Sequence, residues 1–323
     1  MRADATESKE DRLNVLVTGG TGFVGRHLVS VLQENGFSVR VACRAAEREL
    51  TVPSVSVGSI GSRTDWNTAL EGVEAVVHLA ARVHVMGEGA MDRNAFHEVN
   101  TAATIRLARA AVGAGIRRFV FLSTVKVNGE STNERPFSVH DVPHPQGEYA
   151  VSKLDAEIGL SKVAGLDRVI VRSPLVHGAG AKGNLERMCR LALAGVPVPF
   201  GGIHNRRDLV GVRNLAELLV RCISHPSAVG RTFMASDGEA ISTPKLFRLI
   251  ADAMGRRARI VSVPVGLVRA VGRVAGLSEE VSRLTDSLEI DIKETRNLLG
   301  WSPRVSIEEG IAEMARAMTR ARP

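Results

Sequence analysis

The sequence has few cysteines and few aromatic residues, and both shortages exclude kinds of protein. Its 323 residues include three cysteines, Cys43, Cys189 and Cys222. Three widely spaced cysteines supply neither a disulfide framework nor a metal-ligand pair, so we expect no metal and a reducing, cytoplasmic compartment. Aromatic residues make up 4% of the chain, and no basic run alternates with them. We therefore expect no nucleic-acid partner, and we attribute the net charge of +7 to the binding of small phosphorylated molecules.

The sequence also lacks an apolar stretch of 18 residues, which excludes a membrane-spanning helix. The nearest approach is 260–277, where Pro264, Arg269 and Arg273 interrupt the apolar residues. The basic amphipathic character of this segment is compatible with contact to a membrane surface. We expect instead a helix that packs on its own domain. Residues 1–12 are polar and charged, do not form a signal peptide, and are expected to be a loose tail.

A glycine-rich turn lies between a predicted strand, 14–18, and a predicted helix. Glycines in such a turn let the backbone approach a pyrophosphate, which the free N–H groups at the start of the helix then bind. The glycine spacing, G-x-x-G-x-x-G, differs from the standard fingerprint but serves the same chemistry. A tight turn without a ligand is the alternative. The cofactor-binding residues expected here are Gly19, Gly22, Phe23, Val24 and Gly25.

The residue after the second predicted strand, 38–43, bears on the choice of cofactor. An acidic side chain at this place binds the 2′-hydroxyl of the adenosine ribose and indicates NAD. This sequence has Arg44 instead. A cation with no carboxylate favours a 2′-phosphate, so we expect NADP(H), with NAD(H) as the alternative. An ordinary surface arginine is the competing interpretation of Arg44.

Predicted strands and helices alternate over the first half of the chain, with strands at 75–81, 118–124 and 168–172. This alternation predicts an α/β fold with a doubly wound parallel sheet, Rossmann-like, and a smaller C-terminal α/β lobe that binds substrate. His78 lies inside an apolar strand, so we interpret it as a bonded core residue. The expected units are the tail at 1–12, a cofactor-binding domain at 13–175, and a lobe at 176–323 from which about 203–225 returns to the first domain.

The chain contains a single tyrosine, Tyr149, four residues before Lys153 in a predicted helix. Residues four apart lie on the same face of a helix. A nearby cation stabilises a phenolate and lowers its pKa, so the pair can act as an acid/base unit. Ser123 and Thr124 place hydroxyl groups at the carboxyl end of the strand 118–124. A surface helix and a simple strand-end cap are the competing interpretations.

Six motifs in this order resemble the extended short-chain dehydrogenases/reductases that act on nucleotide sugars. The resemblance covers about 13–314, and its motifs lie at 18–25, 78–81, 99–100, 122–124, 149–153 and 172–174. It implies that Tyr149 is the catalytic acid/base and that Lys153 lowers its pKa and holds the nicotinamide ribose. It implies that Thr124 holds the reacting oxygen.

The same resemblance implies further contacts to the cofactor and the substrate. The cofactor residues it implies are Ile60, Leu79, Ala80, Ala81, Asn100, Pro174 and Leu175. The substrate residues it implies are Arg82, Lys126, Asn184, Leu185, Arg207 and Arg283. Guanidinium groups suit bidentate phosphate binding. Without the resemblance, we would interpret these arginines as solvated surface residues. The chain departs from the family at Ser59, where an aspartate is usual, and at Asn128 and His177, where tyrosines are usual.

The segments 81–86, 123–130 and 205–207 most resemble bacterial 4-keto-sugar reductases that form UDP-N-acetylquinovosamine for surface polysaccharides. We therefore expect a cytoplasmic, NADPH-dependent reductase of a UDP-linked 4-keto-6-deoxy sugar. The resemblance implies a homodimer. The first competing function is that of an NAD-dependent UDP-hexose 4-epimerase, which uses the same residues. Two further candidates are a short-chain reductase of a non-nucleotide carbonyl and a non-catalytic NADP-binding scaffold.

Overall fold

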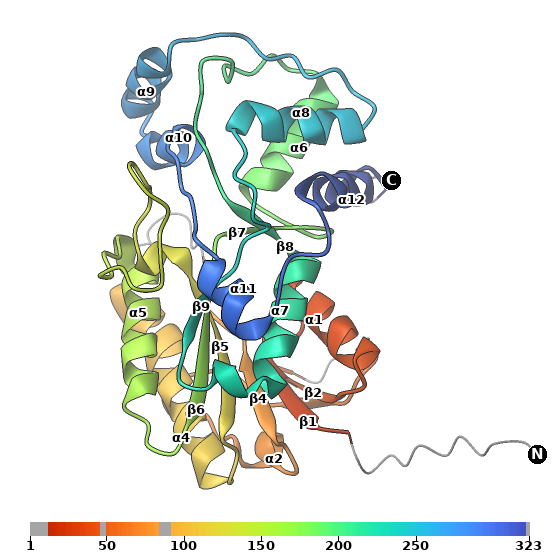
Figure 1. The fold of residues 1–323 in the computed structure, drawn as a ribbon, viewed down its shortest axis with the longest axis vertical. Helices are drawn as coiled ribbons and strands as arrows, with labels where there is room; N and C mark the ends of the chain where they lie inside the picture. Colours follow the sequence, from red (N-terminus) through yellow and green to blue (C-terminus); the bar gives the residue numbers. More distant parts are fainter. Residues whose placement is uncertain (1–11, 46–49, 84–91, 321–323) are drawn as a thin grey trace, which may run out of the picture.

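A parallel sheet of seven strands organises the molecule (Figure 1). The computed structural model describes residues 12–45, 50–83 and 92–320. In spatial order the strands are β3 (Ser54–Ser56), β2 (Ser38–Cys43), β1 (Asn14–Thr18), β4 (Ala75–His78), β5 (Arg118–Thr124), β6 (Asp167–Ser173) and β9 (Thr232–Met234). Every neighbouring pair is parallel. The predicted α/β class with a doubly wound sheet is confirmed. The tail expected at 1–12 lies, except for Arg12, outside the described residues.

Three strands have the bounds that the sequence predicts, at 14–18, 38–43 and 118–124. The strand expected at 75–81 is wrong at its end, because β4 stops at His78. The chain then turns toward the glycine turn, where the Leu79 N–H donates to the Thr18 carbonyl at 3.1 Å. The sequence did not predict β3 and β9, which have three residues each and form the two edges of the sheet.

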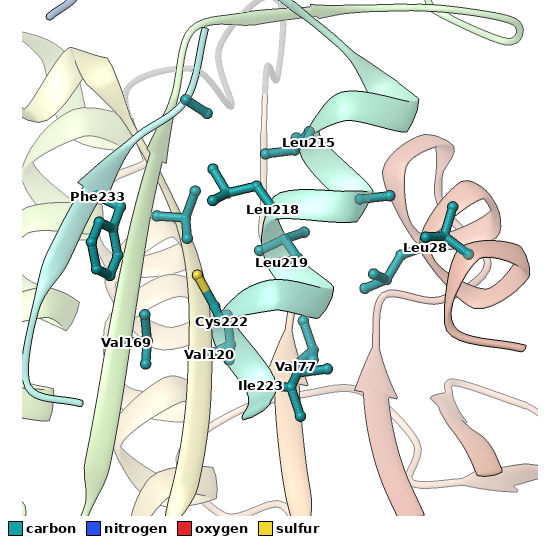
Figure 2. Packing of buried hydrophobic residues seen from close by; sticks show 14 of the residues in the cluster. Leu28, Val77, Val120, Val169, Leu215, Leu218, Leu219, Cys222, Ile223 and Phe233 are labelled. Carbon is teal, nitrogen blue, oxygen red and sulfur yellow. The ribbon is translucent and has the colours of Figure 1, made fainter. Parts of the chain in front are cut away.

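Helices cover both faces of the sheet. On one face lie α1 (Phe23–Glu34) and α7 (Val212–Ser224), and on the other lie α2 (Asn67–Leu70), α4 (Ala103–Gly113) and α5 (Gly147–Ser161). Figure 2 shows Leu218 and Cys222 of α7 beside Val120 and Val169 of the sheet, and all four are fully buried. Burying an aliphatic side chain contributes roughly 1.5–3 kcal/mol. Apolar packing therefore holds α7, which is distant in sequence, against strands β5 and β6.

The helical run between β4 and β5 has an unusual middle. It begins with α3 (Arg93–Phe96), continues through the π-helical segment η3 (His97–Ala102), and ends with α4. A π-helical turn is wider than an α turn and often occurs at functional sites. Here it carries the buried Asn100.

The rest of the chain forms a second lobe above the sheet (Figure 1). It contains the parallel pair β7 (Leu175–His177) and β8 (Leu209–Gly211), and an apolar core among its helices. Its helices are α6 (Asn184–Ala194), α8 (Thr243–Ala253), α9 (Val265–Val274), α10 (Ser278–Thr285) and α12 (Ile307–Arg320). Two 3₁₀ turns, η4 (Val125–Val127) and η5 (Pro226–Ala228), and α11 (Lys293–Leu299) complete the described elements. The domain division at residue 175 stays a proposal.

A buried polar cluster joins the lobe to the sheet. His177 of β7 bonds to the Asp237 carboxylate at 2.6 Å, between Nε2 and Oδ2. Asp237, which follows β9, also accepts from the Asn214 side chain of α7 at 2.8 Å. The His177 ring packs directly on α12, because a Cβ at Gly310 would lie 2.5 Å from its Cε1. Hydrogen bonds and close packing therefore fix the relative position of four elements here.

The helix expected within 260–277 packs on its own domain less than the sequence predicts. Gly272 is buried in α9, where a Cβ would lie 2.5 Å from Val281 of α10, but most of the helix is exposed. The expectation is wrong for its apolar stripe of Leu267, Val271 and Val274, which faces outward. Among the described residues, no helix is long and apolar enough to cross a membrane.

Candidate active site

The glycine turn between β1 and α1 packs so closely that side chains do not fit in it. Gly19 has φ +70°, and a Cβ there would lie 2.8 Å from the Ala80 backbone nitrogen. A Cβ at Gly25 would lie 2.2 Å from the Gly19 carbonyl oxygen. Gly22 precedes α1 with no side-chain cap, and the first turn of α1, which includes Phe23 and Val24, holds no acidic residue. The free N–H groups and the helix dipole therefore suit a pyrophosphate, so the turn fits a dinucleotide.

The end of β4 is held to the glycine turn by His78. Its Nδ1 bonds to the Thr18 hydroxyl at 2.6 Å and its Nε2 to the Thr104 hydroxyl at 2.9 Å. Burial, helped by the charge of Lys153, lowers the pKa of His78 to about 3. His78 is thus a neutral core histidine, as the sequence predicts, and it positions the backbone of Leu79, Ala80 and Ala81.

The region where the sequence predicts the adenosine ribose lies beyond the end of β2. Arg44 is exposed at the carboxyl end of β2, and its carbonyl accepts from the Ser56 hydroxyl at 3.0 Å. Ser59 stands nearby in the chain, and its carbonyl accepts from Thr64 at 3.3 Å. Ile60 packs against the apolar cluster beneath α2. A cation and neutral hydroxyls therefore occupy the region where the sequence predicts the adenosine ribose.

Lys153 anchors helix α5 to strand β5. Its Nζ donates to the Leu122 carbonyl at 2.6 Å and lies 3.9 Å from the centre of the Phe121 ring. Tyr149 lies one turn earlier in α5, and Thr124 lies two residues later in β5. The helical turn from Lys153 to Tyr149 and the two strand residues from Leu122 to Thr124 each advance about 6 Å toward the carboxyl edge of the sheet. Both residues therefore lie toward the carboxyl edge of the sheet, the edge at which the glycine turn follows β1.

Burial changes the acid/base properties of this pair. It raises the pKa of Tyr149 to about 12. It lowers the pKa of Lys153 to about 7, although the Glu157 carboxylate acts in the opposite direction. Lost hydration of the phenol therefore dominates the pKa of Tyr149, and the lowering of that pKa by Lys153 stays a prediction.

A second network supports the other side of Tyr149. The Phe96 ring meets Tyr149 edge-on at 6.5 Å, and the Arg82 guanidinium lies 5.6 Å from the centre of the Phe96 ring. Asn100 holds Arg82 through its backbone, accepting from its N–H at 2.7 Å and donating to its carbonyl at 3.1 Å. Asn100 also donates to the Ser152 hydroxyl at 2.9 Å. The Asn100 amide is therefore occupied by protein contacts and positions the site.

Sequence reasoning missed a buried ion pair behind Lys153. The Arg172 Nη2 of β6 donates to Glu157 Oε2 at 2.6 Å, and both side chains are buried. Glu157 also accepts from Ser123 at 2.5 Å, while Arg172 donates to Asn128 at 3.0 Å. Glu157 stands four residues after Lys153, and this repeat of the Tyr149–Lys153 spacing was the signal available. The network ties α5, β5 and β6 together beneath the acid/base pair.

Two of the expected substrate cations, Lys126 and Arg207, lie near Glu130, an acidic residue that the sequence did not reveal, and Arg283 lies near Arg207. Lys126 forms a two-pronged ion pair with Glu130, at 2.7 and 2.9 Å. Burial lowers the pKa of Arg207. The charges of Asp286 and Glu130 oppose this shift, and the charge of Arg283 adds to it. Arg207 donates to the Asp286 carbonyl at 2.8 Å. The loop after β5 and the segments around 207 and 283 therefore meet at one place.

The remaining predicted residues differ in what they offer. Asn184 begins α6, whose N-terminus has no side-chain cap because Gly183 precedes it at φ +72°. The Leu185 side chain is buried in the apolar core of the lobe, which leaves only its backbone for a ligand. Pro174 is buried just after β6, and Leu175 is exposed on β7. Of the run 81–86, residues 84–86 lie outside the described residues.

Comparison with known proteins is consistent with this arrangement. The family described as "NAD dependent epimerase/dehydratase family" matches residues 15–235. The chain belongs to that family. The predicted family is thereby confirmed, and the member described here is an NAD(P)-dependent enzyme of the extended short-chain dehydrogenase/reductase type.

Proteins similar to this chain include enzymes that are named for nucleotide sugars. A UDP-glucose 4-epimerase of Vibrio cholerae is 39% identical, over 95% of this chain and 96% of the relative. The structure of MoeE5 in complex with UDP-glucose and NAD is 25% identical, with a TM-score of 0.76 over 95% of this chain and 99% of that one. The fold also matches UDP-N-acetylglucosamine 4-epimerase from Bacillus cereus, at 22% identity and a TM-score of 0.77 over 95% and 99% of the chains. The narrower resemblance to 4-keto-sugar reductases is not confirmed.

Proposed function

We propose that this chain is a UDP-hexose 4-epimerase that uses NAD. The similarity to a UDP-glucose 4-epimerase over 95% of the chain is the observation that carries the proposal. The arrangement of Thr124, Tyr149 and Lys153 supports it, because inversion at C4 needs proton transfer at the C4 oxygen. The function expected first from the sequence, reduction of a 4-keto sugar, becomes the second candidate.

The chain's own residues would hold both ligands. The glycine turn would bind the pyrophosphate of the cofactor, and Lys153 would contact its nicotinamide ribose. When bound, the nicotinamide supplies reversible hydride exchange with carbon. Arg207 and Arg283, with the uncapped N-terminus of α6, would hold the diphosphate of the nucleotide sugar. Lys126 and Glu130 would border the sugar.

Tyr149 would move the proton at the C4 oxygen. A phenol with a pKa of about 12 is protonated at neutral pH, so it donates to a developing alkoxide. In the opposite direction, Tyr149 accepts the proton of the C4 hydroxyl, and for this the phenol must first pass its own proton to another group. Lys153, with a pKa of about 7, can accept a proton close to neutral pH. Thr124 would donate a hydrogen bond to the same substrate oxygen, where negative charge grows.

The test is equilibration of UDP-glucose and UDP-galactose, and of their N-acetylated forms, with the purified protein and NAD. We expect NMR to show interconversion of one pair and the absorbance of reduced cofactor to show no net change. Arg207→Ala is expected to raise KM for the nucleotide sugar. No interconversion of any pair, with cofactor bound, would contradict the epimerase proposal.

One observation favours the second candidate. Arg44 places a cation, rather than a carboxylate, at the end of β2, which suits a 2′-phosphate and hence NADPH. A reductase of a UDP-linked 4-keto-6-deoxy sugar would consume NADPH in a one-to-one ratio with product. Arg44→Asp would then weaken NADPH binding much more than NADH binding. An equal effect on both cofactors removes the basis for this candidate.

A further inference from the structure

Helix α9 presents an apolar stripe that the described part of the lobe leaves uncovered. Leu267, Val271 and Val274 are 56%, 61% and 92% exposed. Spacings of four and three residues put these side chains on one face of the helix. Val261 and Leu277, which flank the helix, are 49% and 48% exposed. Five of the eleven large exposed apolar side chains in the described ranges therefore lie within one segment of 17 residues.

This stripe is not the face by which α9 packs on the protein. The packed face holds Gly272, which lies against Val281 of α10, and the half-buried Val265 and Val268. Figure 1 shows α9 beside α10 at the end of the lobe, far from the sheet. The helix is thus already held in place by one face, and the apolar stripe lies on another.

The segment that carries the stripe is basic. The segment 256–277 contains five exposed arginines and no acidic residue: Arg256, Arg257, Arg259, Arg269 and Arg273. Arg269 pairs with Asp286 at 2.6 Å, and the next acidic residues along the chain, Glu279 and Glu280, begin α10. An apolar helix face beside a group of cations is the pattern by which a helix lies in the surface of an anionic membrane.

We propose that α9 and the arginine-rich segment before it, 256–277, dock on an anionic membrane surface. The apolar stripe enters the boundary between headgroups and acyl chains, and the arginines contact lipid phosphates. A second copy of the chain would also cover the stripe, but it would bring the arginines of two such segments together without a carboxylate from either segment. The charge pattern therefore favours a lipid surface over self-association.

Flotation of the full chain with lipid vesicles tests the proposal. We expect binding to vesicles of equal amounts of phosphatidylcholine and phosphatidylglycerol to be at least tenfold stronger than to phosphatidylcholine alone. Salt of about 1 M, which shortens the Debye length to about 3 Å, should abolish the difference. Equal binding to both kinds of vesicle, or binding to neither, overturns the proposal.

Matched variants separate the stripe from the protein as a whole. Val271→Glu is expected to weaken vesicle binding at least tenfold, whereas Val229→Glu, at an exposed valine outside α9, should leave it unchanged. Arg273→Ser should weaken binding about fivefold, near the contribution of one cation, and Arg304→Ser should not. Unfolding midpoints equal to that of the unmodified protein show that the variants fold. Wild-type binding by Val271→Glu overturns the proposal.

A reporter on α9 distinguishes lipid from a second copy. The three native cysteines are buried, so Val274→Cys offers one accessible thiol for an environment-sensitive dye. We expect a blue shift of its emission with anionic vesicles, and none for the same dye on Val229→Cys. A blue shift that grows with protein concentration in the absence of vesicles indicates self-association and overturns the membrane proposal.

Discussion

The same burial acts in opposite directions on Tyr149 and Lys153. Loss of hydration penalises the charged form of each group, which for the phenol is the deprotonated state and for the amine is the protonated state. The pKa of Tyr149 therefore rises to about 12 while that of Lys153 falls to about 7. A cofactor and a substrate would therefore bind to a site in which the lysine titrates near neutral pH and the tyrosine does not.

Removal of the Tyr149 hydroxyl should abolish proton transfer and leave the site otherwise intact. We expect Tyr149→Phe to lower kcat by at least about 100-fold, the usual contribution of general acid/base catalysis. The ring contact with Phe96 needs no hydroxyl, so binding of NAD should change less than about threefold. Turnover and cofactor titration measure the two effects. Near-normal kcat would rule out Tyr149 as the acid/base.

Lys153 should make the stability of the cofactor-free protein depend on pH. Its pKa is about 7 in the folded state and near 10.5 unfolded, so the unfolded chain binds more protons between these values. The stability of the native protein relative to Lys153→Met should therefore rise with pH from 7 toward 10.5. The expected slope is about 1.4 kcal/mol per pH unit.

Urea unfolding of both proteins at several pH values between 7.5 and 9 would measure this difference. Comparison with Lys153→Met cancels the titration of the cysteines, which is the same in both proteins. A difference that stays constant with pH would mean that buried Lys153 keeps an ordinary pKa.

At the scale of the element, the turn between β1 and α1 depends on glycine most strongly at position 25. The Cβ of Gly25→Ala would meet backbone atoms, at 2.2 Å from the Gly19 oxygen and 2.6 Å from the Gly20 Cα. Backbone cannot yield as a side chain does, so we expect at least tenfold weaker NAD binding and a lower unfolding midpoint. Gly113→Ala is the control, because a Cβ there has no neighbour within 4 Å. Calorimetry measures both effects, and equal results for the two variants would contradict this account of the turn.

Elements with a strong local pattern could be predicted from the sequence, and elements that depend on distant partners could not. The strand 118–124 is centred on four consecutive apolar residues, 119–122, and its bounds are as predicted. Strand β9 has three residues and pairs with β6, about 60 residues earlier in the chain, so no local pattern reveals it. The exposed stripe of α9 has the composition of a packed helix, and only the structure shows that nothing described covers it.

The candidate site divides in the same way. The spacing of Tyr149 and Lys153 indicates one helical face, and the glycine turn is a local signal. The Lys153 bond to the Leu122 carbonyl and the Glu157–Arg172 ion pair depend on how α5 packs against β5 and β6. The direction of the Tyr149 pKa shift depends on burial, which the sequence does not supply.

At the scale of the whole molecule, the polar cluster around His177 controls how the lobe sits on the sheet. Gly310→Ala adds a methyl group 2.5 Å from the His177 ring, which Asp237 holds in place. Alanine favours a helix by about 1 kcal/mol over glycine, but overpacking costs about 1–3 kcal/mol. We therefore expect a net loss of stability of up to about 2 kcal/mol and a lower melting temperature.

The matched control for this change is Gly266→Ala in α9, where a Cβ has open space around it. Differential scanning calorimetry should show an unchanged or slightly higher melting temperature for that control. A higher melting temperature for Gly310→Ala would mean that α12 does not depend on contact with the His177 ring.

The single tyrosine of the chain also makes the site visible on its own. Because Tyr149 has no other tyrosine to obscure it, protein grown with fluorotyrosine carries fluorine at one position, beside Phe96 and one turn from Lys153. Its ¹⁹F spectrum would consist of one resonance that needs no assignment. Each ligand that enters the site, and each proton that Lys153 gains or loses, would register as a shift of that resonance.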